Sequence, residues 1–469
     1  MSTHDLCDEL KKSLIDSLGE TKVLWKDADL ASYSMESNIQ MMRAVKKDKY
    51  SPDFVILPTD THDVQKAVRI AAQYRIPIIS KGGGSNLCGM LVPLSGGIIL
   101  DTIKMNKILE VNKPNLYVTV QPGITLKELE ENLARQGLAL NQIQGSYKVA
   151  TVGGSISTSG FPRKHAKYGT IADRIMSLEV VLANGEILRT GQKVLYTSTG
   201  YRLHQLFVGA EGTLGIITEA TIRVEPRPER QEAIMAYYDN FKSALDAVIK
   251  IKTSGVTFVS AEAFTVPKEW YNNTPEGKDA LIIADFEGTE GEVEAEVAFV
   301  KNIVNKTGGV SAPAEDAQNY VDGYQMIWCG TRAMEDIEGD VICPYIPIEN
   351  LIEFYDKLWD EIMSKYGIVP SSRGERCGLD CGRYEMAYAT FKLPELNENP
   401  EYYEKAKLEI AELVTSLGGS VAACMGVGVK YRDFLKLEFS EVALDTMRKI
   451  KAVLDPDNIM NPGKKIPNK

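Results

Sequence analysis

Histidine is scarce in this sequence of 469 residues. There are four histidines, and all of them lie within the first 204 residues. Imidazole is the common side chain for proton transfer near neutral pH and a frequent metal ligand. Chemistry in the C-terminal half must therefore use other groups.

The sequence also lacks an excess of positive charge and any long apolar run. Its 53 lysines and arginines are outnumbered by 64 aspartates and glutamates, and the net charge of −11 argues against a nucleic-acid partner. No stretch approaches the roughly 18 consecutive apolar residues that span a bilayer. The first residues lack the apolar core of a signal peptide. We therefore expect a cytoplasmic protein with no membrane span.

Paired cysteines are absent as well. The seven cysteines are an odd number and none form a Cys-x-x-Cys pair, so we expect reduced thiols and no zinc ribbon. The composition, 44% hydrophobic and 25% charged, is typical of a globular chain with a large core. At roughly 150 residues per domain, the length indicates two or three domains.

Regular structure is predicted early in the chain. Two short apolar runs, at 54–58 and 76–80, predict buried strands. Between them, residues 61–75 have the apolar spacing of an amphipathic helix. Together they predict a parallel βαβ unit. A glycine-rich turn, KGGGSNLCGM, directly follows the second strand.

Turn and cap signals divide the rest of the chain. Thr125 is a candidate helix cap with Glu128 three residues later. Residues 177–191 predict a hairpin that turns at Asn184-Gly185. After the proline-containing segment 225–230, apolar strands alternate with amphipathic helices. This alternation predicts an α+β domain with helices on one face of a sheet.

Three stretches of small residues, near 82–90, 145–160 and 209–217, lie in the N-terminal half. Glycines after a buried strand allow backbone N–H groups to converge on an anion. One such stretch alone is more often a plain turn. The first stretch matches neither the P-loop nor the G-x-G-x-x-G pattern. Three stretches in one region predict a pyrophosphate site of a different kind.

These stretches, together with KYG at 167–169, LEVVLANGEILRTG and the terminal LDPDNIMNPGKK, resemble FAD-linked oxidases of the vanillyl-alcohol oxidase superfamily. Within it, the sequence is most similar to the glycolate oxidase / D-lactate dehydrogenase branch. The resemblance implies a PCMH-type FAD-binding domain of two α+β subdomains over 1–226. It further implies an α+β cap domain with an antiparallel sheet over 227–420 and a segment, 421–469, that returns to the FAD domain.

The resemblance also implies which residues hold FAD. They are Gly82, Gly83, Gly84, Ser85, Asn86, Leu87, Gly89, Met90, Gly145, Ser146, Thr151, Val152, Gly153, Gly154, Ser157, Ser159, Glu211, Gly212, Thr213, Gly215, Ile216, Ile217 and Asn461. Some relatives tether FAD through a histidine of the first loop. This loop has none, so we expect non-covalent FAD, and we interpret Cys88 as a buried packing thiol.

The substrate side departs from the branch. There, two histidines and a glutamate bind a divalent metal, and another histidine takes the hydroxyl proton. Gly378 and Glu385 replace the metal histidines, Cys424 replaces the glutamate and Met425 replaces the base. An arginine that helps to fix a carboxylate is also missing from 343–351. Methionine cannot take a proton, so the branch's mechanism does not transfer intact and no metal is predicted.

Four residues remain as catalytic candidates. Arg383 and Glu385 share a face of an alternating strand, and Glu385 or Tyr384 is the candidate base. The alternative is a solvated salt bridge at the strand end. Arg332, four residues after Trp328, matches an aromatic–x3–Arg pair of the family's cap, although it also fits a helix surface.

A soft-metal site is a further alternative. Cys377, Cys381, Cys424 and Glu385 combine thiolates with a carboxylate, which suits zinc or iron. A Cys-x-x-x-Cys spacing outside a helix is not a ligand signature. Buried, inert cysteines are therefore the favoured interpretation.

The predicted function is FAD-dependent hydride transfer from a small organic substrate to flavin N5 and on to an electron acceptor. The first hypothesis is a 2-hydroxy-acid dehydrogenase acting on lactate or glycolate, with an electron-transfer flavoprotein or another acceptor as partner. The lost metal set favours a second, in which the substrate is an alcohol, a phenol or an ether-lipid precursor. The third is an FAD subunit that only relays electrons.

Overall fold

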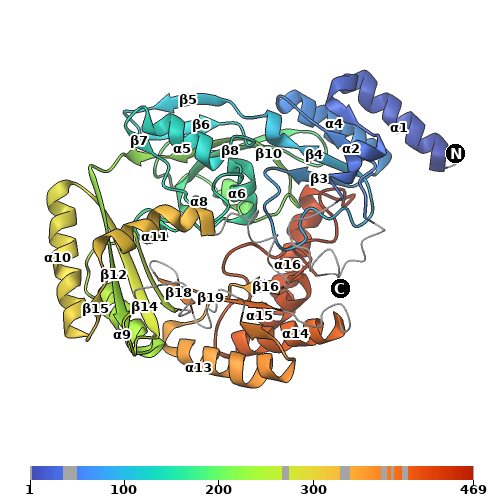
Figure 1. Ribbon diagram of the computed structural model, residues 1–469. Helices are drawn as coiled ribbons and strands as arrows, with labels where there is room; N and C mark the ends of the chain where they lie inside the picture. The colour runs from blue at the N-terminus through green and yellow to red at the C-terminus, as the bar shows by residue number, and fades with distance from the viewer. Residues whose placement is uncertain are drawn as a thin grey trace.

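The computed structural model describes residues 3–34, 50–266, 274–327, 339–370, 378–381, 385–392 and 400–467. Two sheets built by the N-terminal half lie side by side in the upper half of the view in Figure 1. The largest sheet and its helices lie below them (Figure 1). Helices and mostly antiparallel sheets alternate through the chain, so the expected α+β class is confirmed.

The first sheet has the order β1-β2-β4-β3. The strands are Val23–Leu24, Phe54–Ile56, Ile98–Asp101 and Ile78–Lys81. β2 and β3 are both parallel to β4, which lies between them, so the βαβ prediction is confirmed with an inserted strand. Helix α4 (Thr61–Tyr74) joins β2 to β3, and α1 (Thr3–Leu18) packs with it through Leu10, Leu14, Val64 and Val68.

The second sheet is antiparallel, in the order β5-β6-β10-β8-β9. Its strands are Ile108–Asn112, Tyr117–Val120, Ile216–Arg223, Ile175–Val181 and Ile187–Gly191. The predicted hairpin is β8–β9, with Gly185 at φ +77° in its turn. Helix α5 (Leu126–Ala134) begins after Thr125, whose side chain accepts a hydrogen bond from the Glu128 N–H at 3.1 Å, as predicted. Helix α6 (Val152–Thr158) forms within the second small-residue stretch.

The third sheet has eight strands, in the order β15-β12-β14-β13-β18-β19-β16, with β17 paired to β19. In that order the strands are Val310–Ser311, Arg230–Tyr238, Ala280–Gly288, Ser260–Thr265, Gly378–Cys381, Glu385–Lys392, Gly339–Ile342 and, last, Val369–Pro370. All of the pairings are antiparallel.

Helices cover both faces of this sheet. Helices α9 (Phe241–Thr253) and α10 (Glu290–Lys306) pack on one face, against Ile282 and Ala284. Helix α11 (Ala314–Ile327) packs on the other, against Phe264. The expectation of helices on one face is therefore wrong, because the sequence of α11 was not recognised as a helix.

Further helices and strands connect or follow these sheets. They are α2 (Asp27–Ala31), β7 (Leu138–Ala139), α7 (His165–Tyr168), α8 (Ile171–Arg174), β11 (Glu225–Pro226), α13 (Leu351–Asp356), α14 (Pro400–Ser416), α15 (Leu435–Glu438) and α16 (Glu441–Leu454). None of the helices in the described ranges has the length and apolarity needed to cross a membrane.

The chain returns to the first sheet after α16. The Ile78 N–H donates to the Ile459 carbonyl at 2.8 Å, and the Asn461 N–H donates to the Ile78 carbonyl at 2.9 Å. Lys464 adds a hydrogen bond from its ammonium to the Val92 carbonyl at 2.6 Å. Residues 459–464 thus lie along β3 and the glycine-rich turn that follows it.

Candidate active site

The three small-residue stretches meet at one deep cavity. The predicted FAD residues that line it are Gly82, Gly83, Gly84, Ser85, Asn86, Leu87, Met90, Gly145, Ser146, Thr151, Gly153, Gly154, Ser157, Glu211, Ile216, Ile217 and Asn461. Other predicted FAD residues belong to the same stretches without lining the cavity. They are Gly89, Val152, Ser159, Gly212, Thr213 and Gly215.

Close packing explains the first two glycines of the loop. A Cβ on Gly82 would lie 2.2 Å from Thr151 Oγ1, and one on Gly83 would lie 1.9 Å from the Val149 carbonyl oxygen. Neither distance is possible for real atoms. Glycine is therefore required so that the first stretch can lie directly on the second.

The same loop offers backbone donors to the cavity. Within the described part of the chain, the N–H groups of Gly82, Gly83, Ser85 and Asn86 donate to no protein acceptor. Converging main-chain donors of this kind suit an anion such as a diphosphate. The donor set of the loop therefore fits FAD.

Asn86 connects the loop to the far side of the cavity. Its Oδ1 accepts hydrogen bonds from the N–H groups of Cys88 at 2.8 Å and Met90 at 3.3 Å. Its Nδ2 donates to the Met425 carbonyl at 3.2 Å. This side chain positions protein backbone on both walls.

Glu211 has a similar connecting role. Its buried carboxylate accepts hydrogen bonds from the N–H groups of Val427 at 2.7 Å and Gly428 at 2.9 Å. The third stretch is thereby joined to the loop that contains Met425. This carboxylate contacts the protein, and its role is therefore structural.

Asn461 joins three segments. Its Nδ2 donates to the carbonyls of Met90 at 3.2 Å and Glu211 at 2.8 Å. Its Oδ1 is buried without a protein hydrogen-bond partner in the described chain, although the residue lines the cavity. A buried acceptor normally has a donor, so this oxygen is a natural contact for a ligand.

Lys81 is a lining residue that the sequence interpretation missed. It is the only cationic side chain that lines the cavity among the described residues, and its Nζ lies 2.8 Å from Asp101 Oδ2. Tyr33 donates its hydroxyl hydrogen to the same carboxylate at 3.1 Å. Burial, with the charge of Asp101 added, raises the pKa of Tyr33 above its usual value, so this hydroxyl stays protonated. The sequence did contain a signal for Lys81, because this lysine directly follows a predicted strand and precedes three glycines.

The opposite wall belongs to the eight-stranded third sheet and to the loop that contains Met425. Cys424 and Met425 line the cavity, so the positions matched to the branch's metal ligand and base do face it. Glu262, Val341 and Cys343 also line this wall. None of these three was predicted from the sequence.

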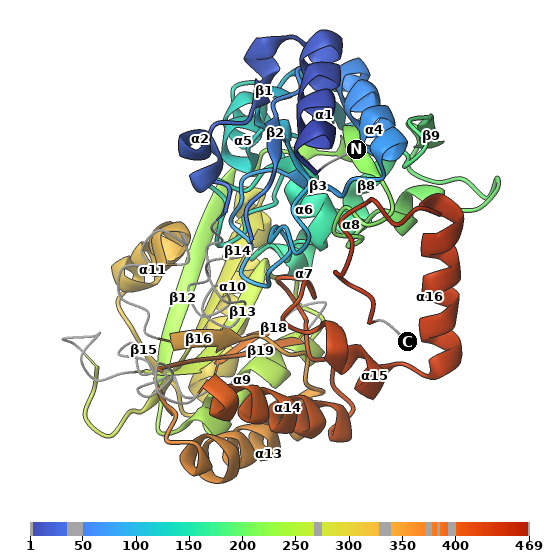
Figure 2. The same cartoon turned by 90° about the vertical axis from the view of Figure 1, so that its right-hand side faces the viewer.

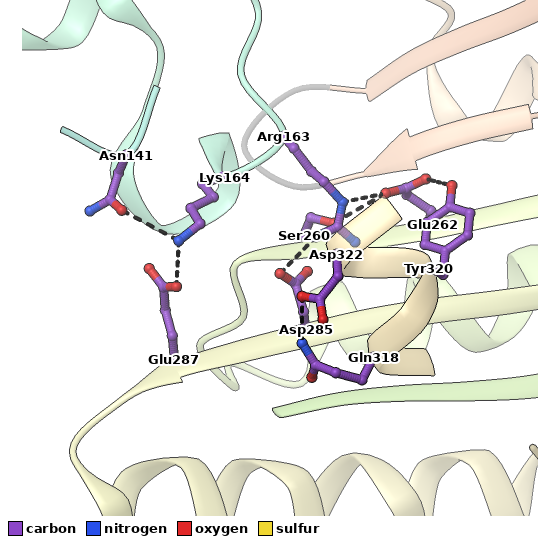
Figure 3. A network of polar contacts seen from close by, with 10 residues as sticks. All are labelled: Asn141, Arg163, Lys164, Ser260, Glu262, Asp285, Glu287, Gln318, Tyr320 and Asp322. Atoms are coloured by element: carbon purple, nitrogen blue, oxygen red, sulfur yellow. Dashed lines mark hydrogen bonds and ion pairs between the residues drawn. The ribbon is translucent and has the colours of Figure 1, made fainter. Parts of the chain in front are cut away.

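Glu262 belongs to a buried polar network, shown in Figure 3. Arg163 Nε lies 3.0 Å from Glu262 Oε1, and Arg163 Nη1 lies 2.8 Å from Asp285 Oδ2. Tyr320 donates its hydroxyl hydrogen to Glu262 Oε2 at 2.7 Å. Burial raises the pKa of Asp285, although the charge of Arg163 opposes this. The sequence signal for Glu262 was its position as a single glutamate between two alanines of an apolar strand.

Three of the four predicted catalytic residues lie outside the part of the chain that the structure describes. Arg332, Arg383 and Tyr384 lie outside the described residues. Glu385 begins β19, where its backbone pairs with Cys381 of β18. Their roles stay predictions, as does the soft-metal alternative, because Cys377 also lies outside the described ranges.

Comparisons with known proteins agree with this geometry. The family description "FAD binding domain" matches residues 52–191, and "FAD linked oxidases, C-terminal domain" matches residues 227–465. The glycolate oxidase subunit GlcD of Bacillus subtilis is 30% identical, over 97% of this chain and 96% of its own length. The D-lactate dehydrogenase of Archaeoglobus fulgidus is 29% identical, over 96% of this chain and 99% of its own.

Solved structures share the fold at lower identity. An alkyldihydroxyacetonephosphate synthase superposes with a TM-score of 0.79 at 22% identity, covering 97% of this chain and 86% of the other. A p-cresol methylhydroxylase superposes with a TM-score of 0.80 at 19% identity, covering 98% and 97%. These likenesses establish the PCMH-type architecture.

The sequence motifs, the cavity with its main-chain donors and the two family matches lead to the same cofactor and reaction class. The cofactor is FAD, and the protein is an FAD-dependent oxidoreductase. The chain belongs to the FAD-linked oxidases, in the branch of the vanillyl-alcohol oxidase superfamily that includes glycolate oxidase and D-lactate dehydrogenases.

Proposed function

We propose that the enzyme oxidises a small 2-hydroxy acid of the lactate or glycolate class. The observation that carries this proposal is full-length similarity to a glycolate oxidase subunit and a D-lactate dehydrogenase. FAD, when bound, accepts a hydride from the substrate carbon at N5. The protein must bind the substrate, orient it and accept its hydroxyl proton.

The N-terminal half provides the FAD contacts in this proposal. The N–H groups of Gly83, Ser85 and Asn86 bind the diphosphate, because they have no protein acceptor in the described chain. Asn461 Oδ1 accepts a hydrogen bond from the cofactor. The remaining predicted FAD residues that line the cavity shape it around the nucleotide and the ring.

The cap wall provides the substrate contacts. Cys424 and Met425 line the cavity where the branch has a metal ligand and a base. Neither a thiol nor a thioether replaces both functions, so a substrate carboxylate must be held by other groups. The predicted contacts of Arg332 and Arg383 with the substrate belong to this part of the proposal.

The same replacement supports a second candidate function. Apart from the carboxylate of Glu262, the residues named on this wall, Val341, Cys343, Cys424 and Met425, carry no charged or hydroxyl group. An uncharged alcohol or a phenol would fit such a wall better than a carboxylate would. In either case we propose that electrons leave the flavin for a separate acceptor, such as an electron-transfer flavoprotein.

We also propose the domain boundaries stated above, with an FAD domain to residue 226, a cap domain to 420 and a returning segment to 469. The three sheets support this division. Apart from β7, which pairs with β11, strands β1 to β10 build the first two sheets, and β12 to β19 build the third.

Anaerobic reduction by a substrate panel tests the proposed function. We expect glycolate, D-lactate or L-lactate to bleach the flavin absorbance of the purified protein within one catalytic turnover, whereas simple alcohols and phenols leave it unchanged. The measurement is stopped-flow absorbance without oxygen, with dithionite as the control for reducible flavin. Bleaching by a phenol or an alcohol alone would replace the first candidate function with the second.

A further inference from the structure

Glu262 is a buried carboxylate on the substrate wall of the cavity. It lies in β13, near the middle of the eight-stranded sheet, and is 2% exposed. It lines the same cavity as Met425, the residue that stands where the branch has its base. An acid at this place can meet a substrate that approaches from the flavin side.

The strand register separates Glu262 from the acid predicted earlier. Glu262 pairs with Asp380 of β18, which pairs with Met386 of β19. Glu385 is one register position away, because it pairs with Cys381, which pairs with Ala261. Neighbouring residues of a strand face opposite sides of a sheet. Ala261 packs in the main hydrophobic core, whereas Glu262 lines the cavity.

Two ion-paired cations, Arg163 and Lys164, lie in the network around Glu262. Arg163 is shared by two buried carboxyl groups, those of Glu262 and Asp285. The neighbouring pair of Lys164 and Glu287, 2.6 Å apart, is balanced in itself. Glu262 is therefore held beside a cation at the wall of the cavity.

Several other polar groups lie around this centre in the described part of the chain. From β13, Ser260 lies 3.5 Å from Glu262. From α11, the Tyr320 hydroxyl donates to Glu262, and Asp322 accepts a hydrogen bond from Gln318 at 2.9 Å (Figure 3). From β18, Asp380 is the backbone partner in the sheet. Arg163 is a cation in direct contact with Glu262.

We propose that Glu262 is the catalytic base of this enzyme, a proposal that rests on the oxidation of a hydroxyl-bearing substrate. The substrate O–H bond breaks and its proton passes to the Glu262 carboxylate. The C–H bond breaks, its electron pair goes to FAD as hydride, and the C=O bond of the product forms. The substrate is oxidised by two electrons, FAD is reduced, and Glu262 later releases the proton to solvent. Tyr320 is a positioning residue that holds the carboxylate through its hydroxyl.

The variant Glu262→Gln tests the proposal, with Asp285→Asn as its matched control. Gln keeps the size of the side chain but cannot accept the proton. We expect the anaerobic rate of flavin reduction to fall by about 10²- to 10⁴-fold, the usual contribution of a general base. Asp285 contacts the same arginine but does not line the cavity, so Asp285→Asn should keep the rate within about tenfold.

A binding measurement supplies a readout without turnover. Oxalate, an inert dianion of hydroxy-acid size, is titrated into the FAD-loaded protein and followed by the shift in flavin absorbance. Removing a negative charge from the wall should tighten oxalate binding by roughly tenfold in Glu262→Gln, which corresponds to about 1.4 kcal/mol. Unchanged oxalate affinity, or a wild-type rate of flavin reduction, would overturn the proposal.

A second variant covers failure of Glu262→Gln to fold. Tyr320→Phe removes only the hydroxyl that donates to Glu262. Losing a donor to the charged form raises the pKa of a carboxylate. The pH at which the rate of flavin reduction rises should therefore move upward, with FAD affinity unchanged, and an unmoved pH profile would refute the role of Glu262.

The inference and the proposed function fail in different ways. If no hydroxy acid reduces the wild-type flavin, the proposed substrate is wrong, and the variants are then measured with whichever alcohol or phenol reduces it. If a substrate reduces the wild type and Glu262→Gln equally fast, the base assignment is wrong whatever the substrate is.

Discussion

At the scale of single residues, the glycines of the first loop act through close approach. Gly83 has no left-handed φ, yet a side chain there would collide with the Val149 carbonyl. The glycine therefore allows two loops to lie against each other. Their contact leaves the Gly83 N–H directed to no protein acceptor in the described chain, and so available to a cofactor.

The variant Gly83→Ala should disrupt this contact. We expect a loss of about 1–3 kcal/mol in the free energy of unfolding, because an inserted methyl group forces the backbone apart. FAD affinity should fall as well, since the donors of the loop move. Guanidinium unfolding and fluorescence titration with FAD measure the two effects.

Gly291→Ala is the matched control for that variant. Gly291 lies in α10, and a Cβ there meets nothing within 4 Å. Alanine in a helix should leave stability unchanged or raise it by up to about 1 kcal/mol, with FAD affinity unaltered. Equal effects of the two substitutions would contradict the close-packing explanation.

Sequence reasoning identified residues at the site more reliably than it identified what they contact. Asn86, Glu211 and Asn461 do line the cavity. Their side chains nevertheless bond to protein carbonyl and N–H groups, several of them more than 200 residues away. Such distant partners leave no trace in local spacing, so the structural part of their role was not predictable.

At the scale of elements, several helices and apolar strands were predicted, whereas α6, α11 and β13 were missed. Helix α6 consists of VGGSIST, whose glycines, serines and threonine have low helix propensity. Burial of Val152 and Ile156 stabilises it instead. Strand β13 and helix α11 were also overlooked, and they contain Glu262 and Tyr320.

Two threonine caps give a prediction at this scale. Thr125 caps α5 and Thr151 caps α6, where its hydroxyl accepts from the Gly154 N–H at 3.2 Å. Replacing either residue with alanine should cost about 1 kcal/mol of folding free energy. Only Thr151→Ala should also weaken FAD binding, because Thr151 alone of the two lines the cavity and lies against Gly82.

Thermal unfolding with and without added FAD separates the two caps. The stabilisation by FAD should be normal in Thr125→Ala and reduced in Thr151→Ala. If both variants keep the full stabilisation, the helix α6 has no part in holding the cofactor.

At the scale of the whole molecule, charges join the N-terminal half to the cap sheet. Arg163 and Lys164 belong to the segment before α7, whereas their carboxylate partners lie on β13 and β14 of the third sheet (Figure 3). Figure 2, a quarter turn from Figure 1, shows α7 next to the strands β13 and β14. The network therefore fixes the cap relative to the FAD cavity.

Removing one cation of this network should be costly. Lys164→Met leaves the fully buried Glu287 carboxylate without the ammonium 2.6 Å away. Breaking a buried pair from one side costs about 3–5 kcal/mol. Guanidinium unfolding should register this loss.

Lys357→Met provides the comparison for Lys164→Met. Lys357 pairs with Glu353 at the same distance of 2.6 Å, but both side chains are exposed. Exposed pairs contribute little to stability, so we expect no measurable change. Similar losses in both variants would mean that burial of the network does not matter.

The resemblance predicted the FAD-binding half of the molecule and the fold class. It did not predict which side chains line the opposite wall of the cavity. Motifs of small residues bind the same cofactor throughout the family, so the sequence alone can identify them. The cap wall has different side chains from the branch, and Glu262 reaches it only through the register of the third sheet. That register depends on strands far apart in the chain.

The last residues of the chain lie beside β3, and Asn461 closes one side of the cavity. During synthesis, residues 1–226 emerge long before this edge exists. The nucleotide can be fully enclosed only after residue 461 has left the ribosome, so its enclosure follows synthesis of the third sheet.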